Sequence, residues 1–143
     1  DIQLPDYRQL YVDLLLKYRG FSFLGEYVTA NASSLEQVYI DPIAISLLQP
    51  TQISEYLAIG SGLNFSLGYI LKNNLGFDIG YSSISPEFDK NLNSIIKSNE
   101  ELRFGLSRYF LENNLKISST YSRINDQNEN SLSLISIVMQ LKL

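Results

Sequence analysis

Apolar and polar residues alternate with a period of two along much of the chain. Residues 10–18 carry apolar side chains at the even positions, whereas Asp13 and Lys17 occupy the other phase. Such alternation is typical of a β-strand with one apolar and one polar face. A second alternating run begins at Phe21, after Arg19 and Gly20. These two residues suit a two-residue hairpin turn, which places Asp13 opposite Glu26 on the polar face.

Continued along the chain, the alternation predicts an all-β fold of seven antiparallel strands. Their expected ranges are 10–18, 21–29, 56–71, 75–84, 101–111, 115–124 and 131–143. Three turns at one end are tight, at 19–20, 72–74 and 112–114. The connections at the other end are longer and mostly polar, at about 30–54, 85–99 and 125–130. Short turns on one side and long loops on the other are the layout of a transmembrane β-barrel.

A sixteen-residue phrase occurs twice, as YILKNNLGFDIGYSSI at 69–84 and as YFLENNLKISSTYSRI at 109–124. Each copy predicts a hairpin with Asn at its turn, because Asn tolerates the positive φ of tight turns. In the first copy a three-residue loop pairs Leu71 with Leu75 and Phe65 with Tyr81. In the second, a two-residue turn of Asn113 and Asn114 pairs Phe110 with Ile117 and Leu106 with Tyr121.

Composition narrows the classes of function. The chain has 143 residues, a net charge of −4 and a pI near 4.7, which argues against nucleic acid as a partner. It has no Cys and no His, which removes thiol chemistry and the commonest metal ligand. Ser94 and Lys97 match an S-x-x-K spacing, but the partner motifs of that hydrolase class are absent. We therefore expect no enzyme activity, no cofactor and no metal site.

Three phrases carry a family resemblance: GYILKNNLGFDIGYSSISP, ELRFGLSRYFLENNLKISSTYS and the final IVMQLKL. Together they resemble the end of the phosphate-selective porin O and P family. The resemblance implies a barrel of about sixteen strands in the bacterial outer membrane of Gram-negative cells, often trimeric, which passes small anions such as phosphate. The chain departs from the family in two respects, because it ends in Leu143 where an aromatic residue is usual and it is acidic.

Seven strands would place the two ends of the chain on opposite sides of a membrane. The sequence 1–143 is therefore interpreted as a single segment, the C-terminal portion of a larger barrel. An alternative places an eighth strand within QVYIDPIAISLL, residues 37–48, which would close a small barrel.

The polar phase of the strands gives the candidate pore-lining residues. They are Asp13, Lys17, Glu26, Asn64, Asp78, Glu101, Arg103 and Lys116. In a porin such charges would set ion selectivity. For the facing pair of Asp13 and Glu26 two outcomes stay open: a wet lumen and neighbouring Lys or Arg side chains screen the two carboxylates, or the pair forms a local cation site that lowers anion preference.

The expected function is passive diffusion of small solutes through a porin. The expected partners are outer-membrane lipid, small solutes or anions, and further copies or other outer-membrane proteins. Two alternatives stay open. One is a barrel that serves as a scaffold or assembly partner, and the other is a soluble ligand-binding barrel.

Overall fold

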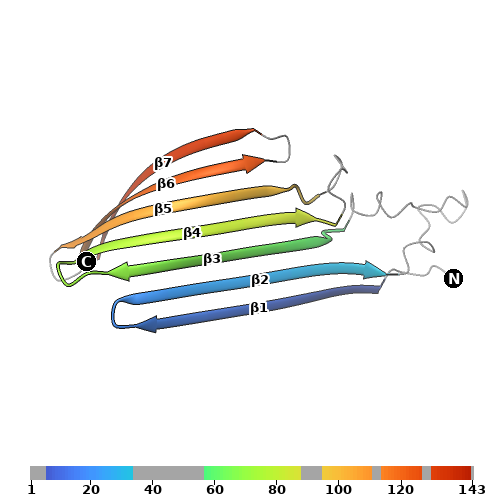
Figure 1. Ribbon diagram of the computed structural model, residues 1–143, viewed down its shortest axis with the longest axis horizontal. Coiled ribbons are helices and arrows are strands. Elements are labelled where there is room, and N and C mark those ends of the chain that lie inside the picture. The colour runs from blue at the N-terminus through green and yellow to red at the C-terminus, as the bar shows by residue number, and fades with distance from the viewer. Residues whose placement is uncertain (1–5, 34–56, 88–94, 111–113, 127–129, 143) are drawn as a thin grey trace, which may run out of the picture. The chain divides into compact units, whose positions relative to one another are not determined.

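A computed structural model describes residues 6–33, 57–87, 95–110, 114–126 and 130–142 (Figure 1). These residues form seven strands in one antiparallel meander, ordered β1-β2-β3-β4-β5-β6-β7. The strands are β1 (Asp6–Tyr18), β2 (Phe21–Ser33), β3 (Gly60–Ile70), β4 (Leu75–Pro86), β5 (Asn99–Phe110), β6 (Leu115–Asp126) and β7 (Ser131–Leu141). The predicted all-β class and the seven strands are confirmed. Within the described residues the sheet is not closed, because β1 neighbours only β2 and β7 neighbours only β6.

The chain divides into two compact units. The first consists of Asp1–Val12, Tyr27–Gly62 and Ile84–Ser98, and the second of Asp13–Glu26, Leu63–Ser83 and Asn99–Leu143. In the first unit, the Tyr7 hydroxyl donates to the Ala58 carbonyl at 2.9 Å. Ile59 is buried there, and its carbonyl accepts a bond from the Glu87 amide at 3.2 Å.

The second unit holds two tight turns whose backbone matches the prediction. Arg19 and Gly20 both have positive φ, at 46° and 87°, as a two-residue hairpin of the primed type requires. In the β3–β4 turn the Leu71 amide donates to the Leu75 carbonyl at 2.8 Å, and Asn74 has φ 62°. The rings of Phe65 and Tyr81 lie 5.6 Å apart, so the predicted register of this hairpin is confirmed.

The predicted register of the β5–β6 hairpin is wrong by two residues. Phe110 pairs with Leu115 and Leu106 pairs with Ser119, whereas Tyr121 pairs with Phe104. Four residues, 111–114, separate the two strands, of which 111–113 lie outside the described residues. A slip of two residues keeps every side chain on its predicted face, because the period of a strand is two. Alternation therefore determined the face, whereas the length of the turn determined the register.

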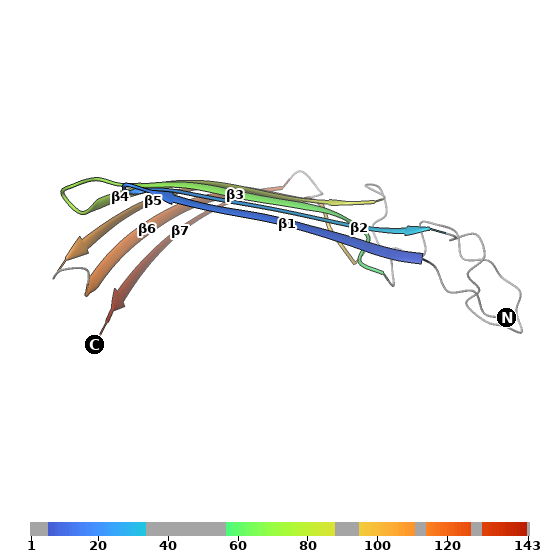
Figure 2. The same ribbon diagram turned by 90° about the horizontal axis from the view of Figure 1, so that it is seen from below.

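The remaining differences concern strand ends. β1 begins at Asp6 rather than at residue 10, and β3 begins at Gly60 rather than at residue 56. The alternative strand at residues 37–48 lies outside the described residues. Figure 2 shows β5, β6 and β7 curving together along their length. No helix long and apolar enough to span a membrane occurs within the described ranges.

Candidate functional site

The second unit has a polar face and an apolar face, and their burial is the reverse of that in a water-soluble sheet. On β5 the polar phase is the covered one: Ser107 is 6% exposed and Arg103 is half-buried. The apolar phase of the same strand is uncovered, with Phe104 46% and Leu106 47% exposed. On β6, Ser122 is likewise 6% exposed, whereas its neighbour Tyr121 in the apolar phase is 39% exposed.

Glycines on the polar face lie beneath the polar side chains of neighbouring strands. A Cβ on Gly80 would lie 3.1 Å from Nε of Arg103, and one on Gly105 would collide with the carboxylate of Asp78. A Cβ on Gly68 would similarly meet Oγ of Ser22 at 2.6 Å. Arg103, Asp78 and Ser22 thus each cover a glycine on the adjacent strand. This packing explains why small residues are the buried ones.

Three strands are joined across the polar face by side-chain hydrogen bonds, which we call the Asn64 tie. The tie consists of Glu26, Asn64, Arg103 and Glu101. Nδ2 of Asn64 donates to Oε2 of Glu26 at 2.6 Å, and Nη2 of Arg103 donates to Oδ1 of Asn64 at 3.0 Å. Nε of Arg103 lies 4.0 Å from Oε1 of Glu101. Arg103 reaches Asn64 from β5 because Gly80 leaves room above β4.

The structure brings together five of the eight predicted lining residues. Four belong to the Asn64 tie, and Asp78 lies against Gly105 on the same strand as Arg103. Lys116 pairs with Tyr109 at the turn end of β6, and its Nζ lies 5.4 Å from the centre of that ring. Asp13 and Lys17 lie in one phase of the edge strand β1, and both are exposed.

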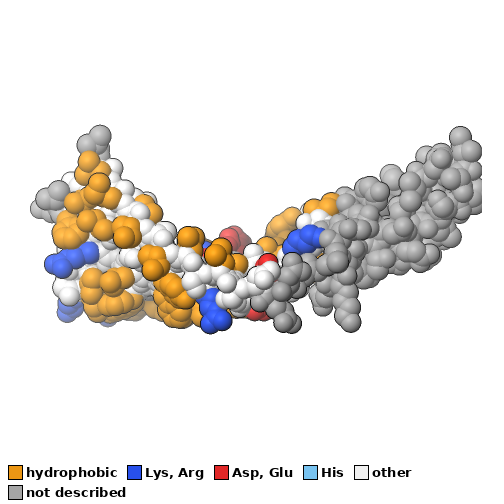
Figure 3. Space-filling model, turned by 90° about the horizontal axis from the view of Figure 1, so that it is seen from above, with side chains coloured by type: hydrophobic (Ala, Val, Ile, Leu, Met, Phe, Trp, Pro, Cys, Tyr) orange, Lys and Arg blue, Asp and Glu red, His pale blue; other side chains and the backbone are white. Residues whose placement is uncertain are grey.

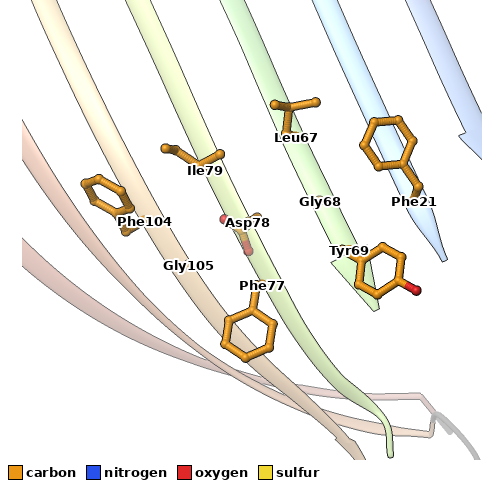
Figure 4. Close-up of a pocket in the computed structure, with 9 residues that line it drawn as sticks. All are labelled: Phe21, Leu67, Gly68, Tyr69, Phe77, Asp78, Ile79, Phe104 and Gly105. Carbon is orange, nitrogen blue, oxygen red and sulfur yellow. The ribbon is translucent and has the colours of Figure 1, made fainter. Parts of the chain in front are cut away.

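The apolar face carries large uncovered side chains over β2 to β5. Figure 4 shows six of them around an open groove of about 410 Å³: Phe21, Leu67, Tyr69, Phe77, Ile79 and Phe104. They come from four neighbouring strands. Hydrophobic side chains are also visible across the surface in Figure 3. No second layer covers this face within the part of the chain that the structure describes.

Aromatic and charged groups occur near both ends of the apolar face. Toward the tight turns, the Arg19 guanidinium lies 5.2 Å from the Tyr18 ring centre, and that of Arg108 lies 5.3 Å from the Phe110 ring centre. Toward the long loops, the Tyr81 hydroxyl donates to Glu100 at 3.3 Å. Nearby, Nε of Arg123 donates to Oγ of Ser131 at 3.2 Å.

Sequence reasoning missed the buried serines and the tie itself. Ser107 and Ser122 stand in the polar phase of their strands and gave no signal of burial. The usable signal was the recurrence of glycine in the same phase, as at Gly80 and Gly105. That Arg103 covers Gly80 and Asp78 covers Gly105 follows only once the β4–β5 register is known. The sequence does not predict this register, because no short turn connects the two strands.

In the residues described, no group of three or more acidic side chains is arranged to hold a metal ion. No protein family, no curated protein and no solved structure matches the chain.

Proposed function

We propose that the chain forms part of the wall of an outer-membrane β-barrel that lets small solutes diffuse passively. The observation that carries the proposal is the inverted burial of the second unit. Phe104 and Leu106 are exposed on inner strands that have neighbours on both sides, whereas Ser107 and Ser122 are buried. Full burial of such a side chain contributes about 1.5–3 kcal/mol, so in water each of these half-exposed side chains would forgo roughly half of that free energy. Lipid against the apolar face removes this cost.

Strand length and the ends of the apolar face also support the proposal. The strands have 11 to 13 residues, and about 9–11 residues of a tilted strand cross a hydrocarbon core of about 30 Å. Tyr18 with Arg19 and Phe110 with Arg108 lie near one end of that face, and Tyr81 lies near the other. Aromatic rings at both levels, with long cations beside them, are typical of membrane interfaces.

The two edge strands of the sheet would need further strands beside them in a membrane. Unpaired backbone groups in hydrocarbon cost several kcal/mol each, so β1 and β7 need strand partners in a membrane. We propose that further strands supply them and close a barrel around the polar face. This arrangement would turn the Asn64 tie toward a water-filled interior.

The test is ion conductance of the purified whole protein in a planar lipid bilayer. We expect stepwise current increases as single barrels insert, and none from the same preparation after unfolding. A protein that inserts into lipid but carries no current would contradict the porin and favour the scaffold. A protein that stays dispersed and folded without detergent would contradict the membrane assignment itself.

A further inference from the structure

We infer that the polar face favours small cations over anions, and that Arg103 is a positioning residue rather than an anion-binding one. This inference rests on the proposed function, because selectivity requires a conducting pore. It departs from the anion preference that the family resemblance implies.

The charges on the polar face are unevenly placed along the strands. In the polar phase of the strands the five acids are Asp13, Glu26, Asp78, Glu101 and Asp126, and the three bases are Lys17, Arg103 and Lys116. Lys17 is the last residue but one of β1, and Lys116 is the second residue of β6, so both lie next to turns. Farther from the turns Arg103 is the one base of this phase among five acids, so negative charges exceed positive ones by four.

Arg103 is held in contacts that would compete with a bound anion. Its Nη2 donates to Asn64, its Nε lies 4.0 Å from Glu101, and the group lies against Gly80. Asn64 in turn donates to Glu26, so two carboxylates flank the guanidinium through the tie. An anion approaching Arg103 would be repelled by both. The positive charge is therefore compensated within the wall.

Asp78 has no such compensation. No ion pair within the described residues involves the carboxylate of Asp78. The carboxylate of Asp78 lies over Gly105, two residues along β5 from Arg103, and is exposed. Uncompensated carboxylates on a low-dielectric wall raise the local concentration of cations through their focused field.

The experiment measures the reversal potential of the whole protein in a bilayer under a potassium chloride gradient. We expect a reversal potential of the sign that a cation-selective channel gives in this gradient. The double variant Glu26→Gln with Asp78→Asn should lower the cation-to-anion permeability ratio by roughly twofold or more. The control is Glu100→Gln, which removes one carboxylate next to Glu101 but in the opposite phase of β5, and it should leave the ratio unchanged.

Arg103 is tested in the same channel. Arg103→Gln should raise the cation preference, and Arg103→Lys should preserve it. Inorganic phosphate added to the wild-type channel should leave the chloride current unchanged, and this measurement needs no variant.

Three outcomes would overturn the inference while leaving the porin intact. They are an anion-selective wild-type channel, a double variant with an unchanged permeability ratio, and a phosphate block that Arg103→Gln abolishes. A protein that inserts but does not conduct would overturn the proposed function and this inference with it.

Discussion

The two faces of the second unit differ in what covers them. On the polar face, Arg103 and Asp78 lie over glycines of the next strand, and Ser107, which lies over Gly76, is buried. On the apolar face, Leu67 and Phe104 stand uncovered. A water-soluble sheet buries its apolar face against a second layer. In the proposed barrel, this reversal means that the apolar face meets lipid and the polar face meets water.

Charge on the apolar face gives the sharpest test of this contrast. Leu67→Arg or Ile79→Arg should lower the free energy of unfolding in lipid by about 2–4 kcal/mol, because a charge would enter hydrocarbon. The control is Ser66→Arg, next to Leu67 but on the polar face. This change should lower the free energy of unfolding only slightly. Urea titrations in lipid vesicles measure both. Equal losses at Leu67 and Ser66 would show that the faces do not differ.

Added volume tests the same contrast from the polar side. Gly80→Val places a side chain where Nε of Arg103 now lies, 3.1 Å from the new Cβ. We expect a loss of about 1–3 kcal/mol from overpacking. Gly25→Val is the matched change in the apolar phase of β2, where a Cβ would meet only the ring of Phe23, which can turn outward. The same titrations should show a smaller loss there, and the opposite order would refute the packing account.

The β3–β4 turn keeps the two faces in place, since a slip of one residue would exchange them. Asn74 has φ 62°, in the left-handed region, so Asn74→Val should cost about 1–2 kcal/mol, whereas Asn74→Gly should be tolerated. Thermal unfolding of the Asn74→Val and Asn74→Gly variants checks this order, and equal losses would show that the left-handed backbone at Asn74 is not the cause.

The two copies of the repeat also show what the sequence could predict. Alternation placed Phe65 with Tyr81, and it assigned Leu106 to the correct face. Alternation could not determine the β5–β6 register, because Leu106 lies on the same face whether it pairs with Ser119 or with Tyr121. The Asn64 tie joins strands that no short turn connects. Its contacts depend on the β2–β3 and β4–β5 registers, which follow long connections, so local pattern carries no information about them.

The smallest expected effect concerns the turn end of the polar face. Lys116→Gln removes the cation over the Tyr109 ring and should cost about 0.5–1 kcal/mol, as expected for an exposed cation–π pair. Lys17→Gln removes the same charge from β1, where Lys17 lies over no ring among the described residues, and should be nearly neutral. A pair of chemical denaturation curves in the same detergent compares them. An equal effect of the two changes would assign the loss to charge alone.

The central claim is that the apolar face lies against lipid. The natural chain has no cysteine, so single spin labels can be placed along β3 without background. In lipid vesicles, labels at Phe65, Leu67 and Tyr69 should collide mainly with dissolved oxygen. Labels at Asn64, Ser66 and Gly68 should collide mainly with a water-soluble nickel chelate. This two-residue period in opposite phases is the predicted result, whereas equal access of the chelate to Leu67 and Ser66 would contradict the account.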